Sequence, residues 1–185
     1  KRQELTRELC RETTGLRLDE VVRYWHERHP WPDEAPEIVE AKILDAVSRL
    51  IIERGEPMPG VKEAVDLLRA ANYELAVASS SPMKLIQASL EAFGMTEYFS
   101  VLHSAESERE GKPHPGVYLS TMRLLGTNPG NCIAFEDSVV GVRAAKSAGA
   151  WVIAVPDQAE ASDPEFAIAD VVLSSLADFS PDLVR

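Results

Sequence analysis

Short apolar runs alternate with amphipathic stretches over most of the chain, from residue 59 to residue 173. The apolar runs, three to five residues long, are typical of strands buried on both faces, whereas the other stretches carry apolar residues at helical spacing. This order of elements predicts an α/β fold with a parallel sheet that is covered by helices on both faces. The predicted strands are 75–78, 100–103, 132–135, 151–155 and 171–173, and the predicted helices around them are 59–72, 81–94, 115–126 and 138–148.

The pattern before Gly55 is different, because helical spacing continues there with no strand between the helices. The stretch 54–57 contains a glycine and a proline and is predicted to be a hinge. We therefore expect a small helical cap over residues 1–56 and an α/β core over residues 57–185. The helices predicted for the cap are Leu18–His29, Glu37–Ile52 and, from its charged pattern, the stretch Lys1–Asp19.

Acidic residues outnumber basic ones by 30 to 19, which gives a net charge of -11 at pH 7. This negative field repels nucleic acid and anionic membranes, and no apolar run is long enough to cross a bilayer, so neither partner is expected. No obligate protein partner is indicated. Cys10 and Cys132 have no metal-binding or redox spacing, which favours a reduced cytoplasmic protein. A phosphorylated substrate, also an anion, would need a local cation or a metal ion.

Polar residues gather where three of the predicted strands end. These are the serines 79–81, the lysine of Gly111–Pro113, and the adjacent acids Glu136 and Asp137. Because ligands of open parallel sheets bind at the carboxyl ends of the strands, we expect these groups to lie close together. Hydroxyls at a helix start, a fixed lysine and a carboxylate pair suit a phosphate beside a hard cation, and oxygen ligands favour Mg²⁺ over zinc.

Each of these groups has a structural alternative. A serine before a helix often only caps it, and Ser81 followed by Pro82 is a typical helix start. Lys112 could be a solvated loop lysine, although its glycine and proline neighbours restrict its direction. Glu136 and Asp137 could cap the next helix, although adjacent carboxylates at a sheet end repel each other unless a cation lies there.

The same stretches resemble motifs of the haloacid dehalogenase-like superfamily, whose phosphatases use an aspartate nucleophile. Val77–Ser81 matches the second motif, Gly111–Pro115 the third and Phe135–Gly141 the fourth, in the family's order. Gly15–Asp19 followed by Tyr24–Trp25 is similar to bacterial hexitol phosphatases and 2-deoxyglucose-6-phosphate phosphatases, and β-phosphoglucomutases are near relatives. The resemblance covers the whole chain and implies a Rossmann-like core with a helical cap whose beginning is absent.

The resemblance implies a Mg²⁺-dependent phosphatase that acts on small sugar or sugar-alcohol phosphates through an aspartyl-phosphate intermediate. Ser79 and Ser80 would bind the phosphoryl group, and Lys112 would neutralise charge between that group and the nucleophile. Asp137 would bind Mg²⁺, with Glu136 as a further ligand or as a support behind it.

Arg17, in the cap, would contact the anionic or polyol end of the substrate, and its alternative is an exposed helix cation. The family's first motif, an Asp-x-Asp at the end of a strand, has no counterpart in the chain. Its aspartates are the nucleophile and the general acid/base, so we expect both to precede Lys1. The sheet would then lack its N-terminal, central strand, and the chain by itself would be inactive.

Two other functions remain open from the sequence. A phosphomutase would use the same site but return the phosphate to a second hydroxyl of the sugar. A non-catalytic relative or fragment would serve as a binding module. A dehalogenase that releases halide is disfavoured, because that branch of the family works without Mg²⁺ and would not need Glu136 and Asp137.

Overall fold

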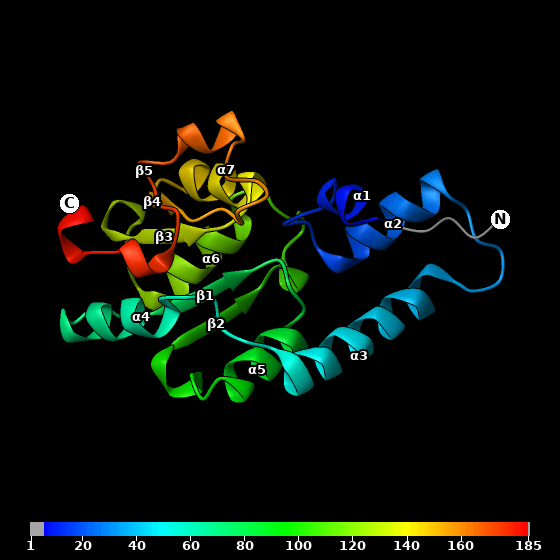
Figure 1. Cartoon of the computed structure of the whole chain (residues 1–185), viewed down its shortest axis with the longest axis horizontal. Coiled ribbons are helices and arrows are strands. Elements are labelled where there is room, and N and C mark those ends of the chain that lie inside the picture. Colours follow the sequence, from blue (N-terminus) through cyan, green and yellow to red (C-terminus); the bar gives the residue numbers. More distant parts are fainter. Residues whose placement is uncertain (1–5, 185) are drawn as a thin grey trace.

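The computed structural model describes residues 6–184, and its helices and strands are arranged in two parts (Figure 1). Helices α1 to α3 lie at one end, and the alternating strands and helices form the other part. The elements of the first part are α1 (Arg7–Arg11), α2 (Leu18–Arg28) and α3 (Pro36–Arg54). Those of the second part are α4 (Val61–Ala70), β1 (Ala76–Ser79), α5 (Met83–Ala92), β2 (Val101–Ser104), α6 (Gly116–Leu125), β3 (Ile133–Glu136), α7 (Val139–Ala148), β4 (Trp151–Ala154) and β5 (Val171–Val172), with short 3-10 turns between them.

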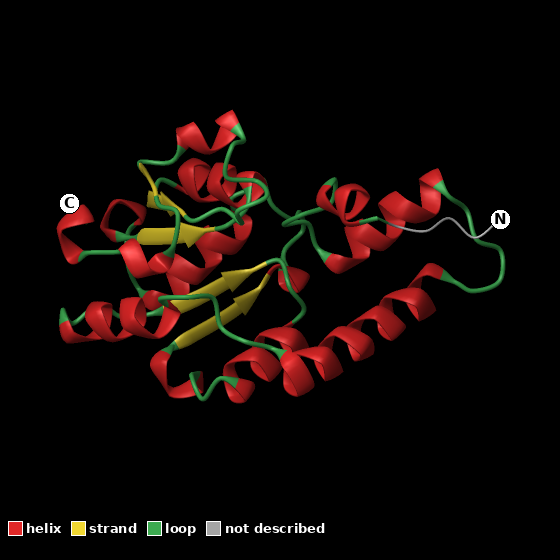
Figure 2. Ribbon diagram, in the orientation of Figure 1, coloured by secondary structure: helices red, strands yellow, loops and turns green. Residues whose placement is uncertain are grey.

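All strand pairs are parallel, and the strands form two groups. One group is the pair β1 and β2, in which Ser79 lies opposite Ser104, and the other has the order β3-β4-β5, in which Glu136 lies opposite Ala154. The arrowheads of β1, β2 and β3 point toward helices α1 to α3 (Figure 2). The carboxyl ends of the strands, where ligands bind in open α/β sheets, therefore face the helical part.

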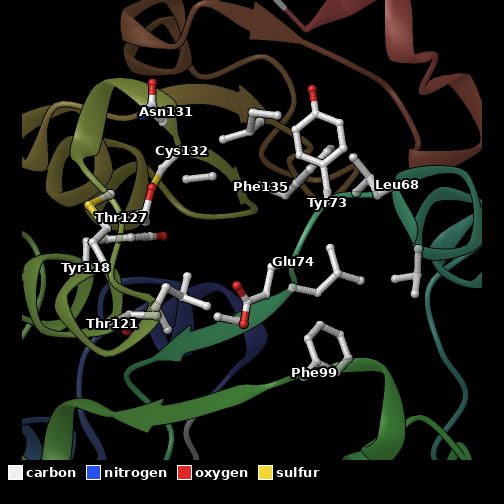
Figure 3. A pocket seen from close by; sticks show the side chains of 18 of the residues that line it. Leu68, Tyr73, Glu74, Phe99, Tyr118, Thr121, Thr127, Asn131, Cys132 and Phe135 are labelled. Carbon is white, nitrogen blue, oxygen red and sulfur yellow. The ribbon is translucent and has the colours of Figure 1, made fainter. Parts of the chain in front are cut away.

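A groove separates the two groups of strands, because β1 and β3 are not hydrogen-bonded to each other. It encloses a cavity of about 440 Å³ and is lined by residues of β1, of β3 and of the helices on either side. In Figure 3, Tyr118 and Thr121 lie on one wall of this groove and Leu68 and Tyr73 on the opposite one. Within residues 6–184 no strand fills the space, so two sheet edges face each other across it.

The side chains of the inner strand β4 are buried on both faces, which explains the unbroken apolar run in its sequence. Val152 of β4 is fully buried against α6 and α7, whereas its neighbour Ile153 is fully buried against α4 and Phe179. Successive side chains of a strand point to opposite faces, so each face needs its own helical cover. This packing is the physical basis of the α/β fold that the sequence predicts.

Two local predictions were wrong. The stretch predicted to be one helix up to Asp19 is interrupted: α1 ends at Arg11, a turn follows, and α2 begins only at Leu18; residues 1–5 lie outside the described part. Gly15 in this turn has φ of +81°, a conformation that no helix contains. Ser81 does not cap α5: the N-cap is Pro82, and the Met83 N–H donates instead to the Glu106 carboxylate at 2.6 Å.

The helices of residues 6–184 are all too short or too polar to span a lipid bilayer.

Candidate active site

Lys112 connects the ends of β1 and β3 across the groove. Its Nζ donates to the main-chain oxygen of Ala78 at 3.3 Å and to the carboxylate of Glu136. Ala78 immediately precedes Ser79, and Glu136 immediately precedes Asp137. The side chain is only 7% exposed, so Lys112 is not a solvated loop residue.

The main chain around Lys112 is packed closely against the cap. The Lys112–Pro113 peptide bond is cis, and α6 begins three residues after Pro113, at Gly116. A Cβ atom at Gly111 would lie 2.6 Å from a carboxylate oxygen of Glu20 and 3.0 Å from Cγ of Arg17. A larger residue here would have to displace these two side chains, so the start of α2 lies directly beside the loop that carries the lysine.

The two acids at the end of β3 have different surroundings. Glu136 is buried, and its Oε1 accepts hydrogen bonds from Lys112 and from the hydroxyl of Tyr118. Asp137 is exposed. The N-cap residue of helix α7 is Ser138, whose Oγ accepts a hydrogen bond from the Gly141 N–H at 3.2 Å. The alternative that the acid pair caps this helix is therefore wrong.

This donor set is compatible with Mg²⁺ but does not form a complete site. Mg²⁺ is usually held by one or two carboxylates together with water and substrate phosphate. Asp137 is exposed and could supply one such oxygen, whereas Glu136 is buried and its Oε1 already accepts from Lys112 and Tyr118. Within the described residues, no three histidine, cysteine or acidic side chains are grouped as a metal site. Further oxygen ligands would have to come from substrate, water or another strand.

The serines after β1 lie at the end of the groove. Ser79 Oγ accepts a hydrogen bond from the Ser81 N–H at 3.0 Å. Ser80 is buried, and its Oγ has no hydrogen-bond partner within the described part of the chain. A buried hydroxyl without a partner is unfavourable in an apolar setting, and a phosphate oxygen at this strand end would satisfy it.

Arg17 does not extend into solvent as an exposed helix cation would. Its Nη1 donates to the main-chain oxygens of Glu108 at 2.9 Å and Ala105 at 3.3 Å, in the loop after β2. Its Nη2 forms an ion pair with Asp19 at 2.9 Å, and the side chain is 14% exposed. These contacts fasten the start of α2 to the core, and contact with substrate remains a prediction for this residue.

The charges between the cap and the loop after β2 are mainly negative. Burial raises the pKa of Glu40, and the nearby charges of Asp19 and Glu106 raise it further. An anionic substrate would therefore depend on Lys112 and on a metal ion for its binding.

Tyr118 belongs to the same cluster, although its position in the sequence indicated only the apolar face of a helix. Its hydroxyl donates to Glu136 and lies 3.5 Å from Lys112 Nζ. Burial and the charges of Glu136 and Asp137 raise its pKa well above the usual value. A tyrosine within an apolar stripe was the available signal, because a buried hydroxyl needs a partner, but the partner lies 18 residues away.

Comparisons with known proteins agree with these motifs. A family model described as "haloacid dehalogenase-like hydrolase" matches residues 2–149. Hexitol phosphatase B of Escherichia coli K12 is 41% identical over 171 residues, which are 91% of this chain and 76% of that protein.

Solved structures share the fold. CbbY from Rhodobacter sphaeroides, solved in complex with phosphate, superposes with a TM-score of 0.84 at 31% identity, over 94% of this chain and 80% of that one. A β-phosphoglucomutase from Clostridium difficile gives a TM-score of 0.83 at 19% identity, over 97% of this chain and 80% of that one, a likeness of fold alone.

Proposed function

The chain belongs to the haloacid dehalogenase-like hydrolases and is a phosphatase of that family, and we propose that it hydrolyses phosphate esters of small sugars or sugar alcohols with the help of Mg²⁺. The similarity to hexitol phosphatase B supports this class of substrate. The structural observation that carries the proposal is the position of Lys112, which contacts the ends of both β1 and β3 beside the exposed Asp137.

The nucleophile of this proposal is an aspartate on a strand that fills the groove between β1 and β3. The two edges that face the groove are unpaired in residues 6–184, and the cavity between them measures about 440 Å³. A parallel strand in this place would pair with both edges. Its carboxyl end would lie next to Ser79, Lys112 and Asp137, so that a residue following it reaches the proposed phosphate site.

The chemistry would follow two displacements. A carboxylate oxygen of the aspartate attacks phosphorus, the ester P–O bond breaks, and the sugar hydroxyl leaves with a proton from an acid beside it. Water then attacks the aspartyl-phosphate, and phosphate is released with the carboxylate restored. Lys112 neutralises charge on the phosphoryl oxygens in both steps, while the hydroxyls of Ser79 and Ser80 donate to them.

A magnesium ion held by Asp137 would be a second positively charged group, besides Lys112, next to the phosphoryl oxygens. Glu136 would support the site from behind Asp137, because it is buried and its Oε1 already accepts from Lys112 and Tyr118. Of the two predicted metal ligands, the described geometry favours Asp137.

The test measures phosphate release by the full-length protein from a panel of hexitol and hexose monophosphates, with Mg²⁺ and with excess chelator. We expect turnover only with Mg²⁺. Lys112→Ala and Asp137→Ala should each reduce kcat by about a hundred- to a thousandfold, the effect of one lost transition-state donor. Lys62→Ala is the matched control, because this lysine is exposed on α4 and pairs with Asp66.

Full activity in chelator, or wild-type turnover by Lys112→Ala, would contradict the proposal. An isomerised sugar phosphate in place of free phosphate would instead identify a phosphomutase.

A further inference from the structure

Tyr118 contacts both members of the buried Lys112–Glu136 pair. Its hydroxyl donates to Glu136 Oε1, the same oxygen that accepts from Lys112. Its ring lies 5.0 Å from Lys112 Nζ, within the range of a cation–π contact. One side chain thus touches the lysine with its ring and holds the partner carboxylate with its hydroxyl.

We propose that Tyr118 is a positioning residue, whose hydroxyl fixes the Glu136 carboxylate and thereby directs Lys112 toward the phosphoryl group. This inference rests on the proposed function. A lysine has a flexible four-carbon stem and no directional preference of its own, so its ammonium lies where its acceptors hold it. The acceptors of Lys112 are the fixed main-chain oxygen of Ala78, the carboxylate of Glu136 and, at 3.5 Å, the Tyr118 hydroxyl itself.

The carboxylate is the movable part of this arrangement. Rotation about the last torsion of a glutamate is broad, so a carboxylate is held in place chiefly by its hydrogen bonds. Oε1 of Glu136 has two donors, Lys112 and Tyr118. Without the hydroxyl, the lysine would be the remaining donor to this oxygen, and the pair could shift together away from the strand ends.

Filling of the core does not require this hydroxyl. Tyr118 lies among buried apolar residues, including Val117 and Met122 of the same helix, where phenylalanine would occupy nearly the same volume. A buried hydroxyl is favourable only when it is bonded. The bond that Tyr118 makes is to the carboxylate that holds the proposed catalytic lysine.

Tyr118 is also part of the wall of the groove between β1 and β3 (Figure 3). A strand in this groove would pack against the side chain of Tyr118. Tyr118 would then fix the lysine relative to the same strand that carries the nucleophile.

The experiment compares Tyr118→Phe with Tyr98→Phe in the full-length protein. Tyr98 is a matched control, because its ring packs against α5 and has the Arg69 guanidinium 4.6 Å from its centroid, remote from Lys112. For each variant, kcat and KM are measured with the best substrate of the panel. The dissociation constant of orthophosphate is measured by calorimetry in chelator.

For Tyr118→Phe we expect kcat to fall about ten- to a hundredfold, the range for a catalytic group misplaced by up to an ångström, with KM changed less than about threefold. Orthophosphate should bind about tenfold more weakly, while Tyr98→Phe changes neither quantity. Unchanged kcat and phosphate affinity in a folded Tyr118→Phe protein would overturn the inference. A variant that does not fold would also overturn it, since the hydroxyl would then be needed for the core itself.

Failure of the proposed function can be recognised separately. If the wild-type protein hydrolyses none of the phosphate esters, that function is wrong. The orthophosphate affinities of the wild type and of Tyr118→Phe still decide whether the hydroxyl positions Lys112: equal affinities overturn the inference, and weaker binding by the variant supports it.

Discussion

The buried pair of Lys112 and Glu136 predicts a strong coupling between two substitutions. The side chains are 7% and 5% exposed, so each charge is almost removed from water and is compensated chiefly by the other. Removing one partner of such a pair leaves the other charge buried without compensation, which destabilises a protein by about 3 to 5 kcal/mol. Lys112→Met and Glu136→Gln keep the approximate volume of each side chain while removing its charge.

We expect each single variant to lower the free energy of unfolding by about 3 kcal/mol, near the lower end of that range because Tyr118 and Ala78 retain part of the polar network. The double variant should lose no more than about 3 kcal/mol, as much as one single variant rather than about 6 kcal/mol, because no unpaired charge remains. The coupling energy is then about 3 kcal/mol, at the upper end of the range measured for side chains in contact.

Urea unfolding of the full-length protein at pH 7, in buffer with chelator, measures these differences without linkage to metal binding. The exposed pair of Lys62 and Asp66 provides the control cycle, for which a coupling below about 0.5 kcal/mol is expected. Losses for the Lys112 and Glu136 variants that add within about 0.5 kcal/mol would refute the argument, since they would mean that neither charge depends on the other.

Two further predictions concern the cap and the outer strand. Gly15→Ala should destabilise the protein by at least about 1 to 2 kcal/mol, because φ is +81° and the new Cβ would lie 2.5 Å from Val140 Cγ2; urea unfolding and kcat/KM both report this loss. Burial alone would raise the pKa of Asp170, but hydrogen bonds from Lys146 and the Val152 N–H, with the lysine charge, lower it overall. Because the folded-state pKa is lowered, the stabilisation is present above the unfolded value of about 3.9 and disappears as pH falls below it. Asp170→Asn should therefore cost about 1 kcal/mol at pH 7 and progressively less below pH ~4, as measured by unfolding at several pH values.

Each of these predictions has a control. Gly130→Ala places its Cβ where no atom lies within 4 Å, so unfolding should be nearly unchanged. Asp66→Asn removes a pair on the exposed surface and should shift stability by less than about 0.5 kcal/mol. If Gly15→Ala leaves the free energy of unfolding unchanged, the turn need not approach α7. If the loss of stability in Asp170→Asn does not depend on pH, the charge of Asp170 is not involved.

The strands were predictable because each forms a short, mainly apolar run that packs between helices. Each predicted strand lies within one residue of the observed start and end, as for 132–135 against Ile133–Glu136. Helix α7 was predictable because Ser138 at its start and Gly149 at its end are local signals.

Contacts between residues distant in sequence could not be predicted in the same way. The spacing of α6 places Tyr118 on the apolar face, but no local pattern indicates that its hydroxyl meets Glu136. Likewise, Ser81 and Pro82 form a plausible helix start, yet the donor at the start of α5 is satisfied by Glu106 from another loop. Such partners are selected by the tertiary packing, which brings the ends of separate strands together.

The hydrogen bonds of Arg17 hold α2 to the loop after β2, and they affect how fast the two can separate during turnover. Any motion that lifts α2 from the loop after β2 has to break its bonds to the main-chain oxygens of Glu108 and Ala105. If the two bonds, after rehydration of their groups, add about 3 kcal/mol to the barrier, α2 separates from the loop more than a hundredfold more slowly than it would without them. Departure of the dephosphorylated sugar would then include the cost of breaking these two bonds.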